Sequence, residues 1–289
     1  MRRELLLAAT FATAFAAAAH AQASPSDTRF VAAMAREHAH DAPVATPATL
    51  PAPQQQVRTQ MVVYDTVNGK PVQGFMAWPA RGPRNMPAVV MIHEWWGLND
   101  NIKQMAQRLA GEGYRVLAVD MYNGQVATTP QEAQTYMREV VSNTGRGVSN
   151  LRSAAEFLRL RQRASKVGVV GYCFGGAWSL QTALIMPEEI DAAVMYYGRV
   201  VNDRERLAAL DAPLLGIFGA EDRSIPVADV RQMETTLKEL GKTVEVQVYE
   251  GAGHGFANPS GQGYNAAAAD DAWRRTTGWF AQHLRTPTN

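Results

Sequence analysis

Apolar-rich runs alternate with amphipathic stretches along most of the chain. Residues 87–93, 115–122, 166–172, 191–198, 212–222 and 243–250 are short runs of the kind found in strands buried in a sheet. Residues 101–114, 130–142, 147–162, 174–186, 227–241 and 266–284 follow the helical pattern. This alternation predicts an α/β fold with a mostly parallel central sheet and helices on both of its faces.

The first part of this pattern predicts a hairpin. Residues 57–66 and 71–79 have the composition of strands, and Asn68-Gly69 between them is a turn signal. We expect this hairpin to form an antiparallel edge of the sheet. A single domain is expected over residues 57–286. Residues 24–56 are rich in Pro, Ala, Gln and Thr and are expected to form a flexible linker.

Residues 1–23 have the layout of a secretory signal peptide. Two arginines precede an apolar stretch over residues 5–19, which ends in two overlapping A-x-A sites. An ordinary amphipathic helix is a poorer reading, because the stretch is apolar on all sides. We therefore expect secretion, to the bacterial periplasm, with no membrane contact once the signal is removed.

Composition and charge narrow the function. The 289 residues are 46% hydrophobic and 19% charged, with a net charge of +1, so nothing indicates a nucleic-acid partner. We expect a monomer that acts on a small molecule. The chain has one cysteine, which excludes zinc and iron–sulfur sites built from several cysteines. His38 and His40 in the linker make a weak metal site by themselves, so no metal or cofactor is expected.

The single cysteine lies in the stretch "GYCFG" at residues 171–175. This G-x-Cys-x-G falls between a predicted buried strand and a predicted helix, as in a nucleophile elbow. The flanking glycines leave room for neighbouring backbone, and the start of the helix favours the thiolate of Cys173. A buried, inert cysteine beside helix-packing glycines is the alternative, and the α/β context argues against it.

A cysteine nucleophile needs a base and a group that orients the base. Asp222 and Glu221 follow one predicted strand, and His254 lies in a glycine-rich loop after the next. The order nucleophile, acid, histidine is that of α/β hydrolases. Asp222 is the better orienting acid, although it could instead hold a turn or cap the following helix. Of the other histidines only His93 competes with His254 as the base.

The stretch "VVMIHEWWGLND" at residues 89–100 ends the strand that precedes the oxyanion-hole loop in α/β hydrolases. The backbone N–H groups of Trp95 and of Phe174, the residue after the cysteine, are the candidate oxyanion donors. The side chains of Trp95 and Trp96 are expected in a pocket wall, with core or surface packing as the alternative.

Four stretches, "HEWWGLN", "GYCFGG", "GAEDRSIP" and "GAGHGFAN", resemble the signature blocks of the dienelactone hydrolase family, in the same order. The type enzyme of this family opens dienelactone to maleylacetate, as a carboxymethylenebutenolidase. The resemblance implies an α/β-hydrolase fold, a Cys173–His254–Asp222 triad and an auxiliary acid, Glu94. It also implies a resting thiol that loses its proton when substrate binds.

One departure concerns the substrate. The type enzymes bind the substrate carboxylate with two arginines, and Asn258 stands where one of them is expected, four residues after the histidine. Arg138 is near the expected place of the other, but a surface arginine is the simpler reading. Tyr136 and Tyr196 fall near positions that line the family pocket, or they pack in the core.

The sequence thus predicts a secreted hydrolase of carboxylic esters or lactones with a cysteine nucleophile. Two alternatives remain open at this point. One is a periplasmic binding protein on the same fold without turnover, and the other is a thioesterase.

Overall fold

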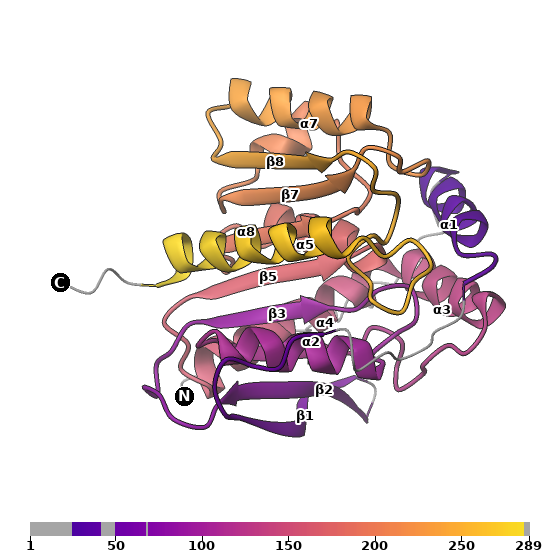
Figure 1. Ribbon diagram of the computed structural model, residues 1–289. Helices are drawn as coiled ribbons and strands as arrows, with labels where there is room; N and C mark the ends of the chain where they lie inside the picture. Colours follow the sequence, from indigo (N-terminus) through magenta and orange to yellow (C-terminus); the bar gives the residue numbers. More distant parts are fainter. Residues whose placement is uncertain (1–24, 42–49, 68, 286–289) are drawn as a thin grey trace, which may run out of the picture.

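A single mixed sheet runs through the computed structural model, which describes residues 25–41, 50–67 and 69–285 (Figure 1). The strand order is β1-β2-β4-β3-β5-β6-β7-β8. The strands are β1 (Val57–Val67), β2 (Lys70–Pro79), β3 (Ala88–Ile92), β4 (Arg115–Val119), β5 (Val167–Tyr172), β6 (Ala192–Tyr196), β7 (Leu214–Gly219) and β8 (Val244–Tyr249). Every residue of β3, β5, β6 and β7 is buried, which explains their continuous apolar sequences.

The predicted hairpin is the antiparallel edge of this sheet. Strand β2 pairs antiparallel with both β1 and β4, and all the remaining neighbours pair in parallel. Gly69 in the turn has φ of 74°, a conformation that favours glycine, and Asn68 lies outside the described residues. The predicted fold class is confirmed by this topology.

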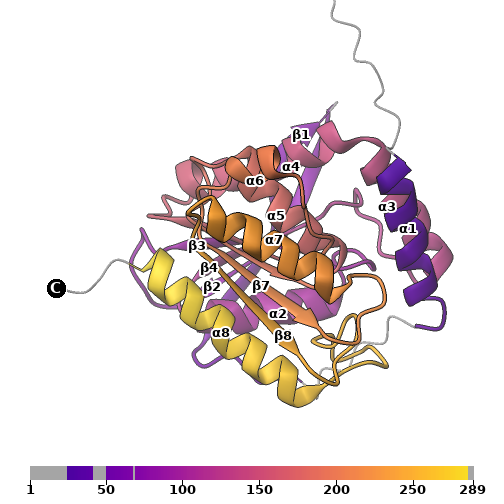
Figure 2. The same ribbon diagram turned by 90° about the horizontal axis from the view of Figure 1, so that it is seen from above.

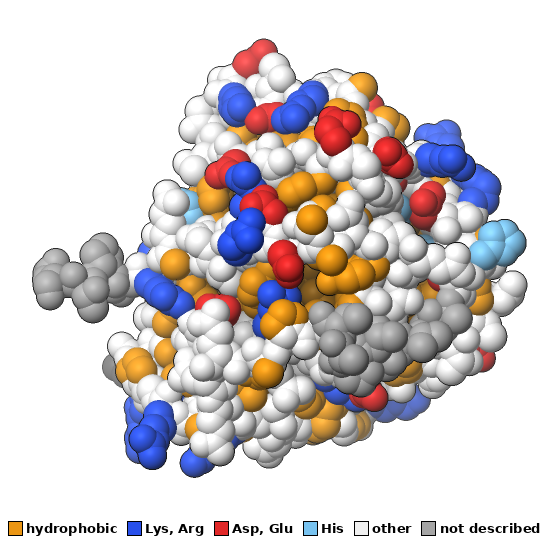
Figure 3. Space-filling model, in the orientation of Figure 1, with side chains coloured by type: hydrophobic (Ala, Val, Ile, Leu, Met, Phe, Trp, Pro, Cys, Tyr) orange, Lys and Arg blue, Asp and Glu red, His pale blue; other side chains and the backbone are white. Residues whose placement is uncertain are grey.

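Helices cover both faces of the sheet (Figures 1 and 2). Helices α2 and α8 lie on one face, and α4, α5 and α7 lie on the other. The helices are α1 (Pro25–Glu37), α2 (Asp100–Gly111), α3 (Pro130–Ser142), α4 (Thr144–Glu156), α5 (Phe174–Ile185), α6 (Arg204–Ala208), α7 (Val227–Glu239) and α8 (Ala266–Leu284), with a π-helical turn at Phe157–Arg161. Basic and acidic side chains are interspersed over the face that carries α8, in keeping with the small net charge (Figure 3).

Helix α1 is the main departure from the predicted organisation. It occupies part of the range expected as a flexible linker, so that prediction is wrong for residues 25–37. Phe30, Val31 and Met34 share one helical face and are buried against the domain. Helix α1 lies beside α3, at the end of the sheet to which β3 and β5 point (Figure 1), and Figure 2 shows the same arrangement from above.

Helix α1 is held at its N-terminal end by two contacts of Arg199, and a cavity lies on either side of it. Arg199 donates to Asp27 at 2.6 Å, and its guanidinium lies 4.8 Å from the centre of the Phe30 ring. Cavities of about 180 and 300 Å³ flank the helix, one lined in part by Phe30 and the other by Val31 and Arg138. Helix α1 is therefore packed less tightly than the strands of the core.

Residues 1–23, predicted to be a signal peptide, and residues 42–49 of the predicted linker lie outside the described residues. Within residues 25–41, 50–67 and 69–285, no helix combines the length and apolar character needed to cross a bilayer.

Candidate active site

Cys173 occupies a sharp turn between β5 and α5. Its backbone has φ of 55° and ψ of −115°, which is rare for a residue with a side chain. A Cβ on Gly171 would lie 1.9 Å from the carbonyl oxygen of Gly175, and one on Gly175 would lie 2.4 Å from that of Ile92. The two glycines are therefore required for the strand to fold back into the helix. This is the strand–turn–helix geometry that the sequence predicted.

His254 and Asp222 meet Cys173 from two loops that follow β8 and β7. The Nε2 atom of His254 lies 3.1 Å from the Cys173 sulfur, and its Nδ1 lies 2.7 Å from Oδ2 of Asp222. The other carboxylate oxygen of Asp222 accepts the N–H groups of Ser224 and Ile225 at 2.8 and 3.0 Å. One aspartate thus holds both its own turn and the imidazole. Asp222 does not cap α7, whose N-cap is Pro226 without a side-chain cap.

The charges of the site favour an ion pair between sulfur and imidazole. Burial raises the pKa of the Cys173 thiol, but the charge and hydrogen bond of His254, with those of His38, outweigh burial and lower this pKa to about 6. Burial lowers the pKa of His254, but the thiolate and Asp222 raise it well above its usual value. The structure thus favours a thiolate at neutral pH, in contrast to the resting thiol that the family resemblance implies.

Glu94 forms the floor of the site beside this pair. Its carboxylate accepts the hydroxyl of Tyr197 at 3.3 Å and the side-chain amide of Asn258 at 2.8 Å. Burial and then the charge of Cys173 raise the pKa of Glu94 to about 7. Asn258 is itself oriented by Ser260, whose N–H donates to its side-chain oxygen at 2.9 Å. Position 258 therefore contributes a neutral amide directed at Glu94.

A second histidine reaches the sulfur from the end of α1. Nε2 of His38 lies 3.6 Å from the Cys173 sulfur, and its Nδ1 lies 2.7 Å from Oδ2 of Asp41. The His38 ring stacks on Trp95 with 5.1 Å between the ring centres. Burial lowers the pKa of His38, but Asp41 and the thiolate outweigh it and raise this pKa to about 9. Sequence reasoning considered His38 only with His40, as a weak metal site in the linker, and did not place His38 or Asp41 at Cys173, because only the docking of α1 brings them here.

The structure separates the two candidate bases. Nε2 of His93 accepts the N–H of Met121 at 3.1 Å, while its Nδ1 lies 2.6 Å from the carbonyl oxygen of Glu94. Burial lowers the pKa of His93. His93 is thus a neutral ring bonded to backbone at both nitrogens, and His254 is the histidine that contacts the sulfur.

The residues predicted for the pocket wall divide into two groups. Trp95, Trp96 and Asn258 line the cavity at the sulfur, together with Glu94, His38, Asp41 and His254. Tyr136 points its hydroxyl at Gln125, and Arg138 is exposed and lines the cavity beside α1 instead.

Tyr196 is buried away from the site, with its hydroxyl 2.7 Å from that of Thr276 in α8. The next residue, Tyr197, is the tyrosine that reaches the site. Its ring centre lies 5.2 Å from that of His254. Tyr197 has φ of 34°, so the chain leaves the regular strand alternation at this residue.

The backbone N–H groups of Trp95 and Phe174 have no hydrogen-bond acceptor among the residues that the structure describes. Phe174 is the first residue of α5, where helical N–H groups are free to bind an external oxygen. The end of β3 packs against the first turn of α5 at Gly175, so the two N–H groups belong to adjacent backbone segments.

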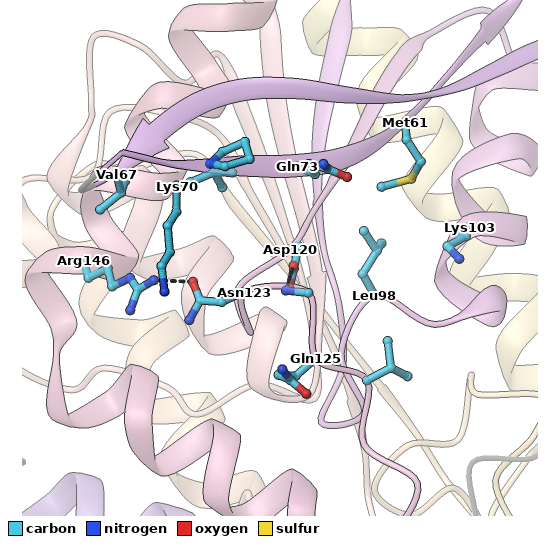
Figure 4. A pocket seen from close by; sticks show the side chains of 14 residues that line it. Met61, Val67, Lys70, Gln73, Leu98, Lys103, Asp120, Asn123, Gln125 and Arg146 are labelled. Atoms are coloured by element: carbon cyan, nitrogen blue, oxygen red, sulfur yellow. Dashed lines mark hydrogen bonds between the residues drawn. The ribbon is translucent and has the colours of Figure 1, made fainter.

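The cavity at the sulfur is small. It measures about 20 Å³, which is too little for an ester, because His38 and its neighbours fill the space over Cys173. A larger cavity of about 540 Å³ lies beside the β1–β2 hairpin (Figure 4), lined by Met61, Lys70, Leu98, Lys103, Asp120 and Arg146 among others. That lining includes neither Cys173 nor His254, so the larger cavity is not the candidate active site.

Comparison with known proteins identifies the family to which the chain is similar. Residues 72–284 match the family model of the dienelactone hydrolase family. Protein usf of Aquifex pyrophilus is 33% identical over 232 residues, which cover 78% of this chain and 99% of that protein. A protein of Methylorubrum extorquens, provisionally named a carboxymethylenebutenolidase, is 34% identical over 227 residues, covering 73% of this chain and 77% of the relative.

A solved structure of a similar protein has the same fold. The crystal structure of a Klebsiella pneumoniae protein, provisionally named a dienelactone hydrolase, superimposes with a TM-score of 0.71 at 28% identity. The match covers 79% of this chain and all of the Klebsiella chain.

Proposed function

Because the chain belongs to the dienelactone hydrolase family, an enzyme family of ester and lactone hydrolases, we propose that Cys173 is its nucleophile, with His254 and Asp222 completing a triad. The observation that carries this proposal is the 3.1 Å contact between the Cys173 sulfur and His254 at a strained turn. A strained turn is retained where the surrounding fold holds a reactive group in place.

In the proposed reaction, the Cys173 thiolate attacks the carbonyl carbon and forms a tetrahedral intermediate. The free N–H groups of Trp95 and Phe174 stabilise its oxyanion, and one such donor is typically worth about 10²–10³ in rate. Protonated His254 then gives its proton to the leaving alcohol, which leaves a thioester on Cys173. His254, now neutral, takes a proton from water as the water attacks the thioester. The acid is released, and the thiolate–imidazolium pair is restored.

We propose that the substrate carries no carboxylate at the end that faces Asn258. An arginine there would supply a bidentate clamp for an anion, whereas the amide of Asn258 is already used by Glu94. A neutral ester or lactone avoids placing a second negative charge beside Glu94 and the thiolate. Glu94, with a pKa of about 7, acts in this proposal as an auxiliary acid next to the sulfur.

Entry of an ester requires movement of α1, because about 20 Å³ is free at the sulfur. The hollows on both sides of the helix support this part of the proposal. We further propose export through the segment at residues 1–23, with the periplasm as destination. That part rests on the sequence alone.

The decisive test is turnover of neutral aryl esters and lactones by Cys173→Ala. We expect a loss of at least about 10³-fold in kcat/KM, by analogy with removal of a nucleophile in other triads. The circular dichroism spectrum and melting temperature should remain close to wild type, since the lost group is one sulfur. Turnover by Cys173→Ala at the wild-type rate would refute the proposed nucleophile. Absence of turnover in wild type across the panel would favour a binding protein instead.

A further inference from the structure

Three metal-ligating side chains converge on one buried point of the molecule. The Cys173 sulfur lies 3.1 Å from Nε2 of His254 and 3.6 Å from Nε2 of His38, and all three atoms lie within 4.8 Å of one another. Thiolate and imidazole are the ligands that Zn²⁺ prefers in proteins. We propose that Cys173, His254 and His38 form a binding site for a zinc ion.

Two of the three separations suit such an ion. Bonds of about 2.3 Å to sulfur and about 2.0 Å to nitrogen at tetrahedral angles place a sulfur and a nitrogen ligand roughly 3.5 Å apart. The observed sulfur–nitrogen distances of 3.1 and 3.6 Å are close to this value. The two Nε2 atoms lie within 4.8 Å of each other and on a tetrahedral ion would be about 3.3 Å apart, so His38 would shift toward His254 when the ion binds.

Both imidazoles carry the outer partner that is typical of zinc ligands. Nδ1 of His254 contacts Asp222 and Nδ1 of His38 contacts Asp41, each at 2.7 Å. A carboxylate at Nδ1 fixes the tautomer that presents the Nε2 lone pair to an ion. A triad needs only one such pair, and in the catalytic proposal His38 and Asp41 do no more than help to stabilise the thiolate. An ion on the sulfur would use His38 as a ligand and Asp41 as its outer partner.

The surroundings also favour a thiophilic ion. Met34, one turn before His38 in α1, brings a second sulfur atom to 3.6 Å from that of Cys173. Three protein ligands leave a fourth zinc position for this thioether or for water. The three ligands come from α1, from the turn before α5 and from the loop after β8, so zinc would fasten α1 to the rest of the domain.

The consequence for catalysis rests on the proposed function. An ion bound to Cys173 occupies the sulfur lone pair that would attack the ester, and His254 can no longer accept a proton. Zinc binding would therefore inhibit hydrolysis and keep α1 over the site. Binding itself requires only the geometry, and it releases protons because the ligating forms are thiolate and neutral imidazole.

The test titrates Co²⁺, as a spectroscopic stand-in for Zn²⁺, into the reduced, metal-free full-length protein. We expect one equivalent to bind, with the sulfur-to-cobalt charge-transfer band and the visible bands of a tetrahedral ion, and Zn²⁺ to displace it. His38→Ala should weaken binding by at least about 10-fold, and Asp41→Asn by about 10–100-fold. Cys173→Ser should abolish the charge-transfer band. His40→Ala is the matched control, because His40 is exposed two residues away, and it should bind like wild type.

Two results would overturn the zinc site. One is the absence of a charge-transfer band in wild type, and the other is equal affinity in wild type and His38→Ala. The proposed function is judged separately, by ester turnover of the metal-free protein. Turnover without cobalt binding would refute only the proposed zinc site. Cobalt binding without turnover would refute only the proposed hydrolase mechanism.

Discussion

At the scale of single residues, the environment of Cys173 determines its reactivity. Cys173 is only 2% exposed, and burial without partners would keep its sulfur as a thiol. Two imidazoles, each with its own carboxylate, reverse that tendency. The same atoms that would make this cysteine a good nucleophile would also make it a good ligand.

The pH dependence of alkylation should report this environment. A free thiol reacts with iodoacetamide with a midpoint near its usual pKa of about 8.5, whereas the pKa of Cys173 is lowered to about 6. Because the thiolate is the reactive form, its alkylation rate in metal-free protein should rise through pH 6 and level off above pH 7. In His254→Ala the midpoint should move to higher pH. A midpoint that stays in place without His254 would show that this histidine does not set the charge of the sulfur.

Asn258 offers a residue-scale test of substrate class. In Asn258→Arg, the cation replaces the amide that donates to Glu94, so we expect the pKa of Glu94 to fall and an anion site to form. The KM for an anionic lactone should fall by about 10-fold relative to that for a neutral one, since a hydrogen bond to a charged group is worth about 1.5–3 kcal/mol. Asn258→Ala is the control, and it should show no such gain. Equal changes for both lactones in Asn258→Arg would argue against the assigned orientation.

At the scale of elements, α1 covers the site at Cys173, whose proposed triad lies in the turn after β5 and in the loops after β7 and β8. It is held by a limited apolar face and by the contacts of Arg199 with Asp27 and Phe30, with a hollow on either side. Elements with few buried contacts open more readily than the strands beneath them.

Weakening this face should therefore increase access to the sulfur. In Phe30→Ser/Val31→Ser, we expect kcat/KM for a bulky aryl ester to rise by about 10-fold or more, because a larger fraction of molecules has the open site. Hydrogen exchange of the α1 amides should become faster in the same variant. Arg36→Ser, on the exposed side of the helix, serves as the control. Faster exchange without a gain in turnover would show that α1 does not limit entry.

At the scale of the whole molecule, the sheet and its helices follow from the sequence because their patterns are local. The buried parallel strands read as apolar runs, and α3 and α8 span the predicted residues. The elbow at Cys173 was predictable too, since glycines at 171 and 175 answer a local steric need.

What sequence reasoning missed depends on contacts between distant segments. Helix α1 has a modest apolar face in an alanine-rich stretch, and nothing local indicates that it docks over Cys173. That Tyr197 reaches the site in place of the predicted Tyr196 has a different cause. The family resemblance indicates Tyr196, but the positive φ at Tyr197 breaks the alternation of side chains at the end of β6, and Tyr197 faces the site while Tyr196 bonds to Thr276.

The groups around the sulfur come from two different parts of the chain. The proposed nucleophile, base and acid come from three separate strand ends, and the sheet fixes them relative to one another. Met34, His38 and Asp41 arrive together on one short N-terminal piece. Exchanging this segment, by evolution or by engineering, would therefore change the entrance to the site and its sensitivity to metal ions while Cys173, His254 and Asp222 keep their positions.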